Sequence, residues 1–143
     1  MSPVTAAANV RRPFRFTLDL RSGVPVYRQI FDRVAGGLAA GFLVAGDQLP
    51  TVRQVAVDLA INPNTVIRAY RELESHDMIE TQQGTGTFVS HQKVQPDGAE
   101  RRRRLAQLAG ESAARAGSDG FSLEELITEL QDLQKESGKK KGK

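Results

Sequence analysis

The stretch "AINPNTVIRAYREL", residues 60–73, decides how this chain folds. It contains Asn62, a residue favoured at a helix N-cap, and Pro63, which suits the first helical position because no hydrogen bond needs its missing N–H. Apolar side chains then recur at helical spacing, at Val66, Ala69, Tyr70 and Leu73. The pattern predicts an amphipathic helix that begins near residue 63 and turns one face to a core.

A shorter helix is predicted just before it. Thr51 and Gln54 have the capping-box spacing, in which each side chain accepts a hydrogen bond from the other residue's backbone N–H. The buried stripe of this helix is Val52, Val55, Ala56 and Leu59. Two short helices separated by the turn "INP" are typical of a helix-turn-helix.

The segment before these helices supplies a third. Residues 14–20, "FRFTLDL", alternate at period two, which predicts a short strand or an extended entry segment. A helix is expected from Pro25 to about Gly41, followed by a loop over residues 42–50. The apolar stripe of this helix is Tyr27, Ile30, Phe31, Val34 and Leu38.

Residues 78–90, "MIETQQGTGTFVS", predict a strand, a Gly-rich turn and a second strand, which is a β-hairpin. Three helices closed by a hairpin give a mainly α fold with a small β-hairpin, the winged helix-turn-helix, over residues 14–91. An unrelated α+β domain with the same order of elements is the alternative, because pattern alone specifies topology poorly. Residues 1–13 are expected to form a flexible arm.

Residues 92–136 differ in composition and predict a helical dimerisation segment, followed by a disordered basic tail over residues 137–143. A helix is expected over residues 101–117, and Ser122 with Glu125 makes a second capping box. Leucines and one isoleucine line one side of both helices: Leu105, Leu108, Leu123, Leu126, Ile127, Leu130 and Leu133. Two helices with so apolar a seam are unstable alone, so we expect the seams to be buried against each other and in a symmetric homodimer. A helix hairpin folded back onto the winged helix is the alternative.

The bulk composition excludes several classes of protein. The chain has 143 residues, 20 Lys and Arg against 17 Asp and Glu, and no cysteine, which rules out disulfides and thiolate metal sites. No apolar run approaches the roughly 20 residues that cross a bilayer, so we expect a cytoplasmic protein. His76 and His91 are the only histidines, and no catalytic triad, phosphate loop or metal spacing appears. We therefore expect no enzymatic activity, no cofactor and no metal.

The helix over residues 60–73 carries polar residues opposite its apolar stripe, namely Asn64, Arg68 and Arg71. Asn pairs bidentately with adenine and Arg with guanine, and recognition helices read bases with their N-terminal turns. Asn64 and Arg68 are thus expected to contact bases, and Arg71 to contact a phosphate. Thr65 and Ile67 flank this polar face on its two sides, its shoulders, and are also expected to contact bases. The alternative is the solvated face of an ordinary amphipathic helix.

Two neighbouring segments predict further DNA contacts. The backbone N–H groups at Thr51 and Val52 begin a helix and suit a phosphate. Arg53, one turn in, is expected to lie along the DNA backbone or reach a base; the alternative is an ion pair with Asp58 or Glu72. The hairpin tip, Thr85, Gly86 and Thr87, is slim enough for the minor groove, although a plain turn is equally consistent.

Residues 24–90 resemble the DNA-binding domain of the GntR superfamily of bacterial transcription regulators. The matching stretches are "SGVPVYRQI", "GDQLPTVRQVA", "NPNTVIRAYREL" and "GTGTFV". The variant "NPNTV.RAY", with a short helical tail, is similar to the YtrA subfamily. The resemblance implies DNA contacts from Arg53, from the start of the recognition helix and from Gly86. It also implies autoregulation and control of a neighbouring transporter operon.

The chain departs from the family pattern in two respects. Many members outside this subfamily have arginines at the positions of Pro63 and Ile67, so base reading here is expected to rest more on Asn62, Asn64, Thr65 and Arg68. The glycine that usually ends the recognition helix is Asp77 here, and Asp tolerates the left-handed conformation less well than Gly.

The function predicted from these residues is a dimeric, sequence-specific DNA-binding repressor of transcription with an inverted-repeat operator. The predicted DNA-binding residues are Thr51, Val52, Arg53, Asn62, Asn64, Thr65, Ile67, Arg68, Arg71, Thr85, Gly86 and Thr87. A winged-helix adaptor that binds proteins instead of DNA is the alternative. Two helices do not wall a pocket of about 300–1,000 Å³, so a small-molecule effector would need a pocket across the dimer interface.

Overall fold

A computed structural model describes residues 14–91 and 98–142 of the chain. The chain forms two compact units: one runs to Gln92 and includes the residues from Ser137 onward, and the other is Lys93–Glu136. The predicted N-terminal arm, residues 1–13, lies outside the described residues.

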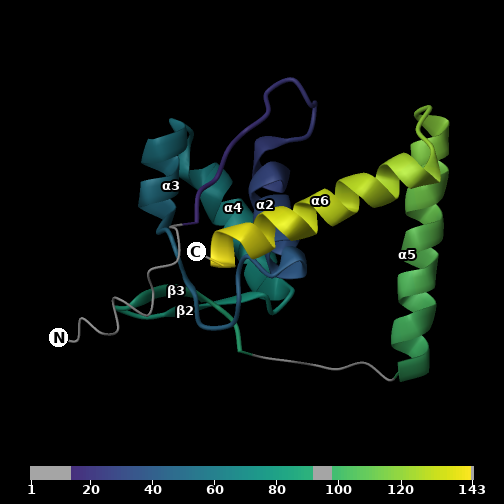
Figure 1. The fold of residues 1–143 in the computed structure, drawn as a ribbon. Helices are drawn as coiled ribbons and strands as arrows, with labels where there is room; N and C mark the ends of the chain where they lie inside the picture. The colour runs from purple at the N-terminus through teal and green to yellow at the C-terminus, as the bar shows by residue number, and fades with distance from the viewer. Residues whose placement is uncertain (1–13, 92–97, 143) are drawn as a thin grey trace. The chain divides into compact units, whose positions relative to one another are not determined.

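The first unit is built on three helices, α2 (Val26–Ala40), α3 (Val52–Leu59) and α4 (Pro63–Ser75), shown in Figure 1. The predicted starts of the last two are confirmed. Thr51 and Gln54 form both hydrogen bonds of the capping box, and the Asn62 side chain caps α4 by accepting from the N–H of Asn64. These caps satisfy backbone donors that the first turn of a helix leaves unpaired.

The core of this unit lies where α4 meets α2 and α3. Val66, Ala69 and Leu73 are completely buried, and Tyr70 beside them is 6% exposed. The other helices, the strands, the entry segment and the turn after α2 complete the cluster with Phe14, Ile30, Phe31, Val34, Leu43, Leu49, Val55, Ala56, Ile79 and Val89. Each of α2, α3 and α4 therefore buries the face that its apolar spacing predicted.

A small antiparallel sheet packs beside the helices. The predicted hairpin is present as β2 (Ile79–Gln82) and β3 (Gly86–Val89). A third strand, β1 (Gln48–Leu49), pairs with β3 and gives the order β1-β3-β2. The prediction of a loop over residues 42–50 is wrong at these two residues, because two residues are too few to show a period-two pattern.

The entry segment, residues 14–20, is not a strand. Its burial alternates nonetheless: Phe14 is buried, Arg15 exposed and Phe16 half-buried. Phe14 stacks edge-on against Phe16, with ring centroids 5.0 Å apart. The segment has no strand partner and is held by this packing and by α2, whose Arg33 and Gln29 side chains donate to the carbonyls of Arg15 and Asp19.

One side-chain hydrogen bond ties the start of α3 to the middle of α4. The Tyr70 hydroxyl donates to the carbonyl oxygen of Pro50 at 2.6 Å. Burial raises the pKa of Tyr70, so the phenol keeps the proton that it donates. Because Pro50 directly precedes the N-cap of α3, this bond fixes where α3 begins relative to α4.

The second unit consists of α5 (Gly98–Ser118) and most of α6 (Leu123–Gly142). The predicted capping box at Ser122 is confirmed, since its hydroxyl accepts from the N–H of Glu125 at 3.0 Å. The prediction of a disordered tail is wrong for residues 137–142, where α6 continues; lysines are good helix formers, and the two glycines there cost at most about 1 kcal/mol each. None of the described helices has the length and apolarity to cross a membrane.

The two helices of this unit diverge from their connecting turn and do not pack along their lengths (Figure 1). The seams consequently stay exposed: Leu105 is 62% and Leu130 is 53% exposed. The prediction that the seams bury against each other within one chain is therefore wrong. Periodicity along each helix identifies its apolar face but does not fix the angle at which two helices meet.

Removing the Tyr70 hydroxyl tests the link between α3 and α4. We expect Tyr70→Phe to lower the free energy of unfolding by about 1 kcal/mol, because the Pro50 carbonyl loses its partner inside the protein. That change corresponds to a fall in Tm of roughly 4–8 °C for a unit of this size. Thermal unfolding at equal protein concentration measures it. An unchanged Tm would show that the bond does not hold the two helices together.

Candidate nucleic-acid interface

The outer face of α4 is open to solvent. Asn64, Arg68 and Arg71 are exposed, whereas Thr65 and Ile67 on the two shoulders are half-buried. No residue of the predicted DNA-binding set is buried in the core. This arrangement leaves hydrogen-bonding side chains on the outer face of an α-helix, an element that the major groove of DNA can admit.

The N-cap of α4 uses the side-chain oxygen of Asn62, which is one of the predicted DNA-binding residues. The Oδ1 atom of Asn62 accepts from the N–H of Asn64 at 2.7 Å. Its oxygen therefore has a structural role, and any base contact by Asn62 would come from its amide nitrogen. Asn64 keeps its own side chain on the exposed face.

The N-terminus of α3 lies in the same unit. The capping box engages the N–H groups of Thr51 and Gln54, at 3.0 Å each. An anion at this terminus would therefore be bound by the N–H groups of Val52 and Arg53. Within the described residues Arg53 forms none of the ion pairs, so the predicted alternative with Asp58 or Glu72 is absent there.

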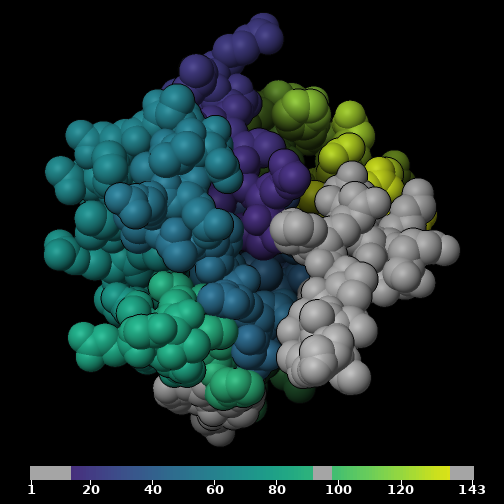
Figure 2. Space-filling model, turned by 90° about the vertical axis from the view of Figure 1, so that its left-hand side faces the viewer, coloured from purple at the N-terminus to yellow at the C-terminus, as the bar shows by residue number. Residues whose placement is uncertain are grey.

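The hairpin is held to both of its neighbours. The Thr81 hydroxyl donates to Glu74, in the last turn of α4, at 2.7 Å, and the Gln48 side chain in β1 donates to the carbonyl of Thr85 at 3.3 Å. At the tip, Gly86 has a φ of 137°, and a Cβ there would lie 2.6 Å from Gln48 Nε2. The backbone conformation favours glycine here, and any larger residue would also displace the end of the Gln48 side chain. Figure 2 shows the surface of α3 and α4, in teal, continuing into the hairpin, in green.

Arg68 has a neighbour that the sequence did not reveal. Its guanidinium carbon lies 3.7 Å from the centre of the Tyr27 ring. Tyr27 was predicted only as part of the buried stripe of α2, and it is half-buried. The two residues are 41 positions apart, so no local pattern could have paired them.

The turn after α4 has the predicted conformation. Asp77 has a φ of 61°, in the left-handed region that glycine favours. His76 is the C-cap of α4, and its ring lies edge-on to Phe31 at 5.4 Å between centroids. The described part of the chain contains no cluster of His, Asp and Glu suited to a metal ion.

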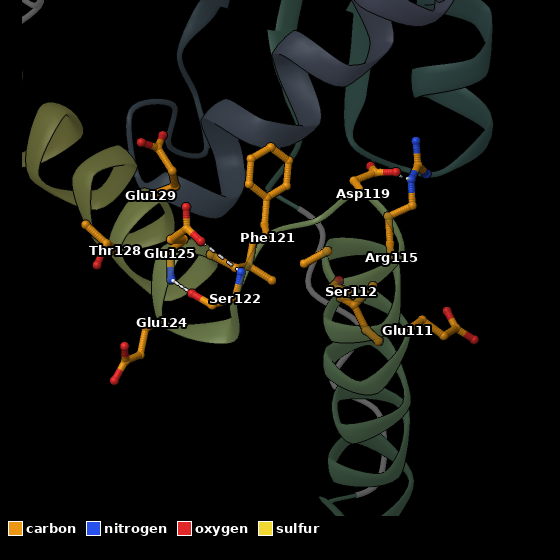
Figure 3. Close-up of a pocket in the computed structure, with 13 residues that line it drawn as sticks. Glu111, Ser112, Arg115, Asp119, Phe121, Ser122, Glu124, Glu125, Thr128 and Glu129 are labelled. Atoms are coloured by element: carbon orange, nitrogen blue, oxygen red, sulfur yellow. Dashed lines mark hydrogen bonds and ion pairs between the residues drawn. The ribbon is translucent and has the colours of Figure 1, made fainter.

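The second unit has a hollow of about 1110 Å³ between the end of α5 and the start of α6 (Figure 3). Leu108, Phe121 and Leu126 provide its apolar surface, and Glu111, Glu125 and Glu129 its acidic groups. Most of these lining residues are exposed, because only two helices and their turn form the walls. The hollow is open, in keeping with the expectation that two helices alone do not enclose a pocket.

Comparisons with known proteins agree with this geometry. The family model described as "Bacterial regulatory proteins, gntR family" matches residues 26–89. The structure of YtrA from Sulfolobus acidocaldarius, a GntR-family transcription factor, is 31% identical, with the alignment covering 69% of this chain and 97% of that one at a TM-score of 0.52. This chain belongs to the GntR family.

Two further proteins are similar to this GntR-family chain. The transcriptional repressor YtrA of Bacillus subtilis is 44% identical over 73 residues, which are 51% of this chain and 56% of that protein. The chain thus matches only about half the length of that curated relative. A transcriptional antiterminator from Listeria monocytogenes is 27% identical with a TM-score of 0.64, covering 84% of this chain and 92% of that one. The predicted fold, a winged helix-turn-helix followed by helices, is confirmed.

Proposed function

We propose that this GntR-family chain is a sequence-specific DNA-binding regulator that represses transcription as a homodimer on an inverted-repeat operator. The observation that carries the proposal is the exposed face of α4, where Asn64, Arg68 and Arg71 lie opposite a completely buried apolar face. Asparagine and arginine are the side chains that discriminate adenine and guanine in the major groove. We further propose that the protein acts in the cytoplasm, where the bacterial chromosome lies.

The neighbouring segments support DNA as the partner. Arg53 stands in the first turn of α3, and the hairpin is fixed to α4 by the Thr81–Glu74 hydrogen bond. A recognition helix flanked by a phosphate-binding helix terminus and a wing would contact base edges and the DNA backbone together. Repression is proposed because a relative, YtrA of Bacillus subtilis, is named a repressor.

The exposed seams support a dimer. Leu105, Leu108, Leu123, Ile127, Leu130 and Leu133 are each between 44% and 62% exposed. Burial of apolar surface is favourable by about 25 cal/mol per Å². A second copy that covers these seams would therefore stabilise the dimer relative to the monomer. A two-fold dimer presents two copies of α4, and helices about one DNA turn apart match an inverted repeat.

Removing Arg53 tests the DNA contact. We expect Arg53→Ala to weaken binding to a duplex selected by the parent protein by about tenfold, as for the loss of a hydrogen bond to a charged group, with no change in Tm. Arg115→Ala, which removes an equally charged exposed residue from α5, should leave affinity unchanged. Mobility shifts measure both. Equal affinity of Arg53→Ala and the parent would remove Arg53 from the interface.

The dependence on salt separates DNA binding from the adaptor alternative. If each half of a dimer neutralises about four phosphates, log affinity should fall with log salt concentration with a slope of roughly −7. A titration of the parent protein across salt concentrations measures this slope. A winged-helix adaptor would bind the duplex weakly, with a slope near zero.

Charge in the seam tests the dimer. We expect Leu130→Glu and Leu108→Glu to shift the protein from dimer to monomer, because a carboxylate would be buried without a partner. Leu20→Glu is the matched control: Leu20 is 80% exposed but lies outside the seam. Sedimentation equilibrium reports the mass of each. A monomeric parent, or seam variants that remain dimeric, would contradict the proposal.

A further inference from the structure

Among the described residues of the first unit, three arginines lie against aromatic rings, and Arg68 lies closest. The guanidinium carbon is 3.7 Å from the Tyr27 ring centre, compared with 4.6 Å for Arg28 on Phe31 and 5.2 Å for Arg33 on Phe14. A separation of 3.7 Å is van der Waals contact, so the guanidinium is stacked on the ring.

The other two arginines have hydrogen-bond partners as well. Arg28 Nε donates to Asp32 at 3.1 Å, and Arg33 Nε donates to the carbonyl of Arg15 at 2.9 Å. The Arg68 side chain has no hydrogen bond or ion pair within residues 14–91 and 98–142. Its five N–H donors lie in the plane of the guanidinium, and a ring against one face leaves that plane accessible.

The ring itself is fixed in place. Tyr27 is the second residue of α2, and it packs against the buried cluster that α2 shares with α4. An arginine that stands alone on a helix samples many rotamers, and ordering it on binding costs free energy. A side chain already laid on a fixed ring has lost part of that freedom beforehand.

We propose that Tyr27 is a positioning residue for DNA recognition: its ring holds the Arg68 guanidinium with the N–H edge directed outward, and so sets base preference at the operator position that Arg68 contacts. The inference rests on the proposed function. It assigns a specificity role to a residue of α2, outside the helix-turn-helix and the wing.

A double-mutant cycle tests the assignment, with a duplex selected from a random pool by the parent protein as probe. Tyr27→Leu, which keeps an apolar side chain but removes the ring, should weaken binding by roughly two- to fivefold, the effect of an exposed cation–π contact. Tyr27→Phe, which keeps the ring, should bind like the parent. In the R68A background, Tyr27→Leu should cause no further loss.

Base preference is a readout that general destabilisation would not move. Repeating the selection with Tyr27→Leu and with Arg68→Ala should relax preference at the same operator position in both. Equal losses from Tyr27→Leu in the parent and R68A backgrounds would overturn the assignment, as would weak binding by Tyr27→Phe. Failure of the parent itself to select any sequence would instead overturn the proposed function, so the two failures are distinguishable.

Discussion

The structure depends on the two-faced character of α4. One side of this helix is packed so closely that Val66, Ala69 and Leu73 have no exposed surface, and the Tyr70 hydroxyl reaches through to the Pro50 carbonyl. Burial of that side fixes the rotation of α4 about its axis, because a helix turned by even one residue would place polar groups in the core. The orientation of the outer face is therefore a consequence of core packing.

Side-chain contacts add to the packing of the shared core in positioning the other parts of the interface relative to α4. Tyr70 places the start of α3, Glu74 holds the hairpin through Thr81, and Tyr27 supports Arg68. Such a scaffold orders the interface before its partner binds. This preorganisation lowers the entropy cost of ordering side chains on binding.

The sequence was most informative where structure is local. The caps at Thr51, Asn62 and Ser122 depend on residues two or three positions apart, and all three appear where predicted. The contacts that escaped prediction join distant positions: β1 pairs with β3 about 40 residues later, and Tyr27 meets Arg68. The outward exposure of the α5 and α6 seams was also missed, because periodicity identifies an apolar face without saying what covers it.

The central claim is that the outer face of α4 enters the major groove of duplex DNA, twice per dimer. Methylation interference on a bound duplex tests it most directly, because dimethyl sulfate marks guanine N7 in the major groove. The account predicts two groups of interfering guanines, related by two-fold symmetry and centred about one helical turn apart. A complex that forms equally well on guanine-methylated duplex would contradict it.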